Sequence, residues 1–183
     1  MLKPLVIAVV VGAVAGGLWC MPGPAPQVQR STGIGYDRIG AARCGAPTKT
    51  TVDLARDAVL IVRAHVLTER AVRASGLIWS EWELDVTETW KGDLPDPPLL
   101  VREPGGKIGH VEMRVSAGVR YRVGDEVVAF IVKDALGQWR TAGMTQGQWR
   151  VADGRAMRAT DRGRSTSVAA LRRAVQITNE EGR

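Results

Sequence analysis

The sequence predicts a mainly β domain of roughly six to eight short strands, with one short helix before the strands and one after them. Between residues 59 and 157, apolar side chains recur at every second position or in short continuous runs. These are the patterns of half-buried and fully buried strands. Glycines, prolines and aspartates interrupt the pattern about every 8–15 residues, a spacing typical of small barrels and sandwiches. A small barrel or sandwich is therefore expected.

Residues 1–25 differ from the rest and predict a signal peptide or a membrane anchor. Lys3 precedes the run Leu5–Trp19, in which no side chain is polar. That length fits the apolar core of a signal peptide and is short for the ~20 residues of a membrane-spanning helix. Extension of the run to Met21 leaves an anchor through residues 5–21 as an alternative. We expect export to a periplasm or out of the cell, with membrane contact through this leader only.

Residues 26–47 form a Pro/Gly-rich arm without apolar periodicity, as expected of a linker. The two cysteines of the chain are Cys20 in the leader and Cys44 in this arm. They can form a disulfide only if the leader is retained, because cleavage after Cys20 leaves a single thiol. Lipidation of Cys20 is a weaker alternative, since Gly17 and Trp19 depart from the usual residues before a lipidated cysteine.

The predicted domain, residues 48–160, begins with a short helix and continues as strands. Thr50 or Thr51 can cap this helix, and Asp53 in its first turn is favoured by the helix dipole. Asp153–Gly154 predicts a hairpin turn. Apolar runs or alternation predict strands at 59–66, 82–90, 99–102, 111–115, 126–133, 139–142 and 148–151. The most continuous apolar run, 126–133, is expected to be the central strand.

Residues 161–183 predict a C-terminal helix and tail. Ser165 or Ser167 can cap the helix. Its apolar residues fall on one stripe, as expected of a helix packed on a sheet: Val168, Leu171 and Val175.

No group of residues predicts catalysis, a metal or a cofactor. His65 and His110, the two histidines, occur in none of the spacings that bind zinc. The sequence has no G-x-S-x-G motif, and Cys44 has no base near it in the sequence. The carboxylates of 81–85 fit the solvent face of a strand. Gly105–Gly106 lacks the helix and lysine of a phosphate loop and is expected to bend the backbone.

Tryptophan is unusually abundant, with six residues against one Phe and two Tyr. Two of these indoles precede an arginine, at Trp139–Arg140 and Trp149–Arg150. Exposed Trp beside Arg stacks on bases and sugars. Trp139, Arg140, Trp149 and Arg150 are therefore the candidate ligand-binding residues. The alternative is core packing, because Trp buries a large apolar area and other aromatic residues are few.

The order of several motifs over about residues 44–152 resembles a known group of folds. The motifs are DAVLIVRAHV at 57–66, a strand from Trp82 that ends in Trp90–Lys91–Gly92, Leu99–Leu100–Val101 followed by Gly105–Gly106, YRVGDEVVAF at 121–130 and TQGQW at 145–149. Together they resemble the netrin-module and tissue-inhibitor-of-metalloproteinase-like OB folds, and bacterial exported domains of unassigned function with the same plan. The resemblance implies an OB-like Greek-key barrel over 48–160. It implies no site, because the inhibitors chelate zinc through an N-terminal C-x-C that this sequence lacks.

These observations predict an extracytoplasmic, non-enzymatic binding or scaffold module whose partner is a protein in the cell envelope or outside the cell. One alternative is an OB-type binder of an anionic polymer, either a polysaccharide or a nucleic acid, in line with the net charge of +6. Most of the arginines, however, are scattered among acids, which favours an ordinary solvated surface and at most weak binding of a polyanion. A second alternative is a regulator of a secreted metalloprotease.

Overall fold

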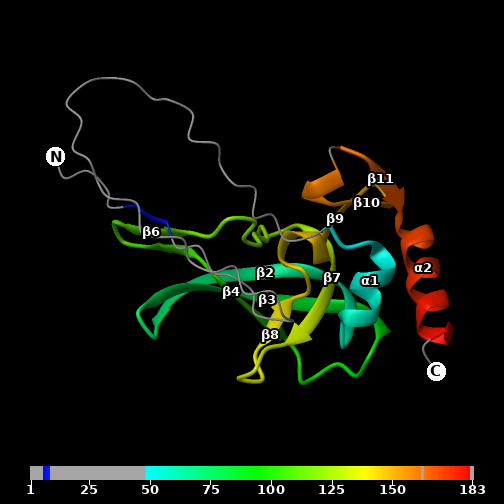
Figure 1. Ribbon diagram of the computed structural model, residues 1–183, viewed down its shortest axis with the longest axis horizontal. Coiled ribbons are helices and arrows are strands. Elements are labelled where there is room, and N and C mark those ends of the chain that lie inside the picture. Colours follow the sequence, from blue (N-terminus) through cyan, green and yellow to red (C-terminus); the bar gives the residue numbers. More distant parts are fainter. Residues whose placement is uncertain (1–5, 9–47, 162, 182–183) are drawn as a thin grey trace, which may run out of the picture. The chain divides into compact units, whose positions relative to one another are not determined.

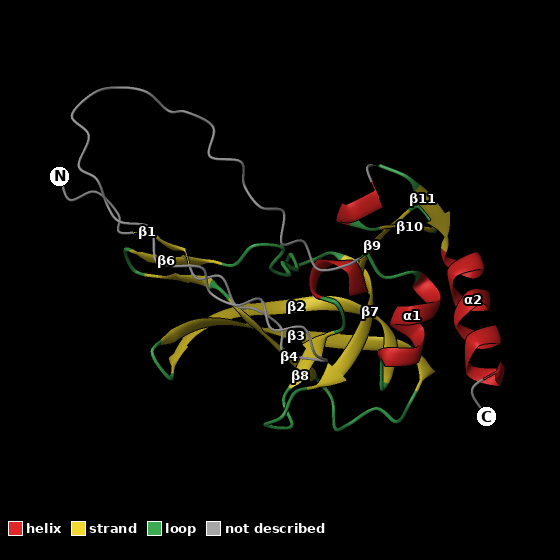
Figure 2. Cartoon of the chain, viewed as in Figure 1, coloured by secondary structure: helices red, strands yellow, loops and turns green. Residues whose placement is uncertain are grey.

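The computed structural model describes residues 6–8, 48–161 and 163–181. The structure is mainly β, with 49% strands, a short helix α1 (Thr51–Asp57) and a C-terminal helix α2 (Val168–Glu181) (Figure 2). The predicted class is confirmed at this level. Thr50 caps α1 and forms a capping box with Asp53, and Ser167 accepts a hydrogen bond from the backbone of Ala170 at the start of α2.

The larger sheet contains eight strands in the order β11–β10–β9–β7–β2–β3–β4, and β8 also pairs with β7 (Figure 1). All of its pairs are antiparallel. Its strands are β2 (Leu60–Ala74), β3 (Leu77–Lys91), β4 (Leu99–Pro104), β7 (Glu126–Lys133), β8 (Trp139–Thr141), β9 (Gln148–Ala152), β10 (Arg155–Met157) and β11 (Ser165–Ser167). Two short 3-10 helices, η1 (Met144–Gly147) and η2 (Ala159–Asp161), follow β8 and β10.

A smaller sheet has the order β1–β6–β5. Its strands are β1 (Val6–Ala8), β5 (Gly106–Ile108) and β6 (Val111–Arg114). Strand β1 pairs with β6 in parallel, and β5 pairs with β6 antiparallel.

Strand β7 is central, as predicted, because it pairs with β2 on one side and with β8 and β9 on the other. Its side chains alternate between two hydrophobic clusters. Val128 and Phe130 belong to the cluster beneath the helices, and Val127, Ala129 and Ile131 belong to the cluster on the other face. Burial on both faces explains why this strand reads as a continuous apolar run.

The β2–β3 hairpin extends beyond its predicted strands. The predicted strands end at residue 66 and begin at residue 82, whereas pairing continues to Ala74↔Leu77 around the turn at Ser75–Gly76. Residues 67–74 are exposed or half-buried and mix polar with apolar side chains, so they show no apolar alternation. Cross-strand pairs hold this half, among them an ion pair between Arg70 Nη2 and Glu81 Oε2 at 2.6 Å.

Strands β4 and β8 are joined by side chains. No backbone pairing links the two strands in the described ranges, so the sheet is not closed by its ladder. Instead, Glu103 on β4 accepts a hydrogen bond from the backbone N–H of Thr141 on β8. Arg102 Nη1 donates to Gln138 Oε1, next to β8, at 3.2 Å.

Helices α1 and α2 lie side by side at one end of the larger sheet (Figure 1). They cover the cluster that contains Leu54 of α1, Leu171 and Val175 of α2, and Phe130. No helix within the described ranges is long and apolar enough to span a membrane.

Of the predicted leader, only Val6–Ala8 falls among the described residues. The predicted arm, the remainder of the leader and both cysteines, Cys20 and Cys44, lie outside them. Export, the cleavage site and a Cys20–Cys44 disulfide therefore stay predictions.

Candidate ligand-binding site

The four residues predicted to bind ligand lie on β8 and β9, which pair with different halves of β7. Trp139 is half-buried, with the Lys133 ammonium 4.4 Å from its ring centroid. Trp149 is 4% exposed and packs on Phe130, with the ring centroids 6.4 Å apart. Its ring is part of the hydrophobic core. Arg150, beside it, is exposed.

Arg140 belongs to a separate cluster around Trp79. The guanidinium carbons of Arg102 and Arg140 each lie 4.9 Å from the centroid of the Trp79 ring. Each arginine also faces a carboxylate, with Arg102 Nε 3.5 Å from Glu81 and Arg140 Nε 3.5 Å from Glu103. These contacts join β3, β4 and β8. Because the two guanidinium charges are compensated by carboxylates of the domain, the cluster leaves little free charge for an anionic ligand.

Two titratable groups beside this cluster are buried. Glu103 is 4% exposed, and burial raises the pKa of its carboxyl against the opposing effects of the Thr141 N–H and the Arg140 charge. Burial also raises the pKa of Tyr121, whose hydroxyl lies 2.8 Å from Thr141 Oγ1. These bonds hold strands together, and neither polar group is presented to solvent as an accessible acid or base.

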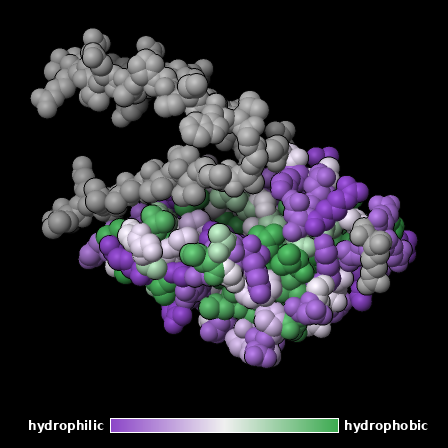
Figure 3. Space-filling view, turned by 60° about the horizontal axis from the view of Figure 1, so that its bottom comes forward, coloured by the Kyte–Doolittle hydropathy of each residue, from purple (hydrophilic) through white to green (hydrophobic). Residues whose placement is uncertain are grey.

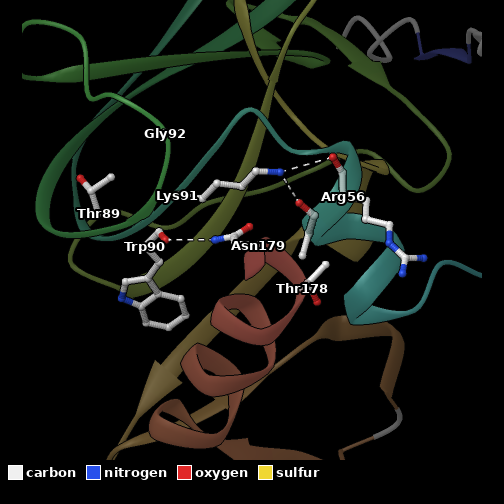
Figure 4. Close-up of a pocket in the computed structure, with 8 residues that line it drawn as sticks. Arg56, Thr89, Trp90, Lys91, Gly92, Thr178 and Asn179 are labelled. Carbon is white, nitrogen blue, oxygen red and sulfur yellow. Dashed lines mark hydrogen bonds between the residues drawn. The ribbon is translucent and has the colours of Figure 1, made fainter. Parts of the chain in front are cut away.

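A cleft of about 620 Å³ lies between the end of α1, the end of β3 and α2 (Figure 4). The Lys91 ammonium crosses it and donates to the carbonyl oxygens of Ala55 at 2.6 Å and Arg56 at 3.4 Å (Figure 4). Burial lowers the pKa of Lys91. Asn179 donates to the carbonyl oxygen of Trp90 at 3.4 Å. Lys91 thus satisfies two C-terminal carbonyls of α1, and Asn179 joins α2 to β3.

A second cavity, of about 520 Å³, lies between β3, the β4–β5 connection, β6 and residues 115–122. We call it the Trp82 cavity. Buried side chains in its lining are Ser80, Trp82, Met113, Val119 and Tyr121, each at most 5% exposed. Charges of both signs line it as well: Glu69, Lys107, Glu112, Arg120 and Arg122. Its size and its mixture of apolar and polar groups are those of ligand pockets.

The indole N–H of Trp82 is buried and has no hydrogen-bond partner among the described residues. The ring itself is 2% exposed and meets Tyr121 edge-on at 5.4 Å. An unpaired buried donor costs about 1–3 kcal/mol. The Trp149 N–H is also unpaired in this part of the chain, but Arg158 covers that ring at 4.4 Å.

Gly105–Gly106 forms one wall of the Trp82 cavity. The φ angles of the two glycines are +114° and +127°, values that residues with a side chain rarely adopt. A Cβ on Gly106 would lie 2.6 Å from Ser80 Oγ. The pair therefore bends the chain after β4 and lets its backbone pass close to β3, as the sequence predicted.

Figure 3 shows the hydropathy of one face of the molecule. On the face shown in Figure 3, hydrophobic areas are small and are separated by hydrophilic side chains. A ligand with a large apolar group would therefore find little open apolar surface on this face.

Sequence reasoning missed the Trp82 cavity because its walls meet only in three dimensions. Trp82 begins the predicted strand 82–90, whereas Tyr121 lies outside every predicted strand, and their contact joins positions far apart in the chain. The one local signal was Gly105–Gly106 between two apolar segments.

The fold and the cavity define a mainly β domain with a ligand-sized pocket. In the described part of the chain, no three His, Cys, Asp or Glu residues gather as a metal site. Compared with known proteins, the chain matches no protein-family model and no curated protein. Function is therefore inferred from the geometry of the site.

Proposed function

We propose that the chain is an exported, non-enzymatic binding module that holds a segment of a partner protein in the Trp82 cavity. The partner is in the cell envelope or outside the cell. The observation that carries the proposal is a cavity of about 520 Å³ whose lining combines buried apolar side chains with charges of both signs.

The cavity suits a peptide segment better than a polyanion. Burial of one large apolar side chain on its lining would contribute about 1.5–3 kcal/mol. The lining holds Lys107, Arg120 and Arg122 but also Glu69 and Glu112, so both signs of charge surround the ligand. This mixture favours a peptide with polar ends over a uniformly negative chain.

We also propose that the strands form the OB-like Greek-key barrel implied by the resemblance over residues 44–152. The path β4–β3–β2–β7–β8 contains five strands, and an OB fold is a five-stranded, partly open barrel. The contacts of Glu103 with Thr141 and of Arg102 with Gln138 bring the two ends of this path together. They support the barrel as a side-chain closure.

A photo-crosslinking residue placed in the cavity tests the binding proposal. The residue replaces Lys107, which lines the cavity, and in a matched variant it replaces Leu136, which is 83% exposed in the β7–β8 turn. Cells that export the chain are then irradiated. We expect one protein to be captured from position 107 and not from position 136.

A second pair of variants shows whether capture depends on the cavity. Val115→Trp adds a large ring at a half-buried lining position and should abolish capture, whereas Leu136→Trp should leave it unchanged. Urea unfolding of Val115→Trp confirms that the variant is folded. Equal capture from positions 107 and 136, or capture that persists in folded Val115→Trp, would refute the proposal.

A further inference from the structure

We infer that the partner segment binds as an extended apolar strand added in parallel to the outer edge of β6, and that residues 6–8 of the predicted leader occupy this edge until the leader is removed. The inference rests on the proposed function and names the binding mode of the same site.

The first observation is the edge of β6 that β1 occupies in the described part of the chain. Strand β6 has β5 on one side and only β1 on the other. The β1 register places Val6 opposite Glu112, Ile7 opposite Met113 and Ala8 opposite Arg114. Without β1, this side of β6 has no neighbouring strand in the part of the chain that the structure describes. Unpaired N–H and C=O groups along such an edge are a template for an added strand.

The second observation is that this edge strand borders the Trp82 cavity. Glu112 and Met113 of β6, and Val115 just after it, line the cavity, and Met113 is 5% exposed. A strand added to β6 therefore runs beside the cavity. Main-chain hydrogen bonds would provide affinity, and the cavity would select among the side chains that alternate along the ligand.

The sequence of β1 indicates the chemistry of the ligand, because β1 occupies the edge to which the ligand would bind. The segment around β1 reads LVIAVV at residues 5–10, which is uncharged and rich in β-branched residues. Strands of this composition suit a paired, half-covered position. The ligand class is thus an extended, apolar, β-branched peptide.

Occupation by the chain's own segment makes binding conditional on processing. A tethered segment competes at an effective concentration in the millimolar range, so it should weaken binding of a free peptide on the order of 10-fold or more. The retained leader would then keep the edge closed, and its removal would open it to the partner.

The test uses the full chain, kept in the cytoplasm so that the leader stays attached, and the variants Ile7→Pro and Ile7→Ala. Proline removes a backbone N–H and cannot lie inside a ladder, whereas alanine retains the N–H. The probe is a fluorescent peptide, KKLVIAVVKK, with KKLPIAPVKK as the matched control peptide. Binding is measured by anisotropy, and amide hydrogen exchange is measured over residues 111–114.

We expect Ile7→Pro to bind the probe at least about 10-fold more tightly than the wild type, and Ile7→Ala to resemble the wild type. Amides of residues 111–114 should exchange faster in Ile7→Pro and regain protection when the probe binds. Equal affinities in all three chains, equal binding of the control peptide, or no change in exchange would overturn the inference. Specific capture from position 107 together with such a result would leave the cavity as the binding site and remove only the β6 edge.

Discussion

The Glu103 carboxylate is a main contact between β4 and β8, and its replacement by alanine should destabilise the domain strongly. Its Oε1 accepts the backbone N–H of Thr141, and its Oε2 lies 3.5 Å from Arg140 Nε. Glu103 is 4% exposed and Thr141 is 5% exposed, so water has little access to replace the acceptor. Glu103→Ala therefore removes the partner of a buried N–H and one carboxylate partner of Arg140.

The size of the effect follows from these contacts. A buried N–H left without a partner costs about 1–3 kcal/mol. Loss of the buried side-chain atoms adds about 1 kcal/mol, because the space they filled collapses only in part. The expected loss is about 2–4 kcal/mol out of a total stability of about 5–15 kcal/mol. With a urea m-value of about 2 kcal/mol/M, the unfolding midpoint should fall by about 1–2 M. Glu103→Gln keeps an acceptor oxygen for Thr141 and should lose about 1 kcal/mol or less.

The pH dependence separates the charge of Glu103 from its hydrogen bond. Burial raises the pKa of Glu103 above its usual 4.5, so the folded chain retains a proton that the unfolded chain has already lost. Because the folded state binds more protons in this window, wild-type stability falls as the pH rises from the unfolded pKa through the raised folded pKa. Glu103→Gln has no such proton. Its stability relative to the wild type should therefore improve as the pH rises.

Urea unfolding followed by tryptophan fluorescence, at about pH 4 and about pH 8, measures both effects. Leu136→Ala, which changes an 83% exposed side chain, is the control. An alanine midpoint within about 0.3 M of the wild type would refute the reasoning, because β4 and β8 would then not depend on this carboxylate. A glutamine variant that lost stability relative to the wild type as the pH rose would contradict the assigned direction of the pKa.

Three further predictions use the same chain. Gly92→Ala should lower the free energy of unfolding, measured with urea, by about 3 kcal/mol or more, and Gly76→Ala should lower it by about 1–2 kcal/mol. The two glycines have similar φ angles, +78° at Gly92 and +77° at Gly76, so the backbone strain of alanine is similar at both. A Cβ at position 92 would lie 2.1 Å from a backbone oxygen, whereas a Cβ at position 76 would have nothing within 4 Å. Equal losses of stability in the two variants would contradict this geometry. Lys91→Met should lower the free energy of unfolding by about 1–2 kcal/mol, since its ammonium donates to two carbonyls of α1, while the exposed Arg173→Met should change it little. Heparin affinity should be weak at low salt and lost near about 0.15 M salt; binding that survives there would favour the anionic-polymer alternative.

The core strands were predictable because their burial is visible in the order of residues. The run 126–133 became β7, and the alternation from Trp82 became part of β3. Asp153–Gly154 forms the predicted turn between β9 and β10. In each case a local period records which side chains leave water, and a strand is the conformation that fits that period.

Other strands were missed because pairing, not burial, holds them. Ser167 caps α2 as predicted, but Ser165–Ser167 also pairs with β10 as β11 before α2 begins. Gly106–Ile108 is too short and too polar to read as a strand, yet it pairs with β6. Their hydrogen bonds depend on partners that no window of the sequence contains.

For the candidate ligand-binding residues too, the local sequence predicted less than the contacts between distant segments decided. Trp149 and Arg150 are adjacent in the sequence, yet the indole is in the core and the guanidinium is exposed. Arg140 and Arg102 meet at Trp79, 61 and 23 residues from it in the chain. Adjacency of Trp and Arg in the sequence therefore suggested a stacking site. In the fold, the strands place these side chains in different surroundings.

By itself, the sequence determined that this protein is mainly β, that a short helix precedes β2 and another follows β11, and that 126–133 is the central strand. These features follow from local periodicity and capping, which act within a few residues. Only the tertiary structure decided that β4 meets β8 through Glu103, that Trp82 and Tyr121 line a cavity, and that β6 presents an edge beside it. Such features depend on contacts between distant segments, and those contacts exist only when the chain is folded.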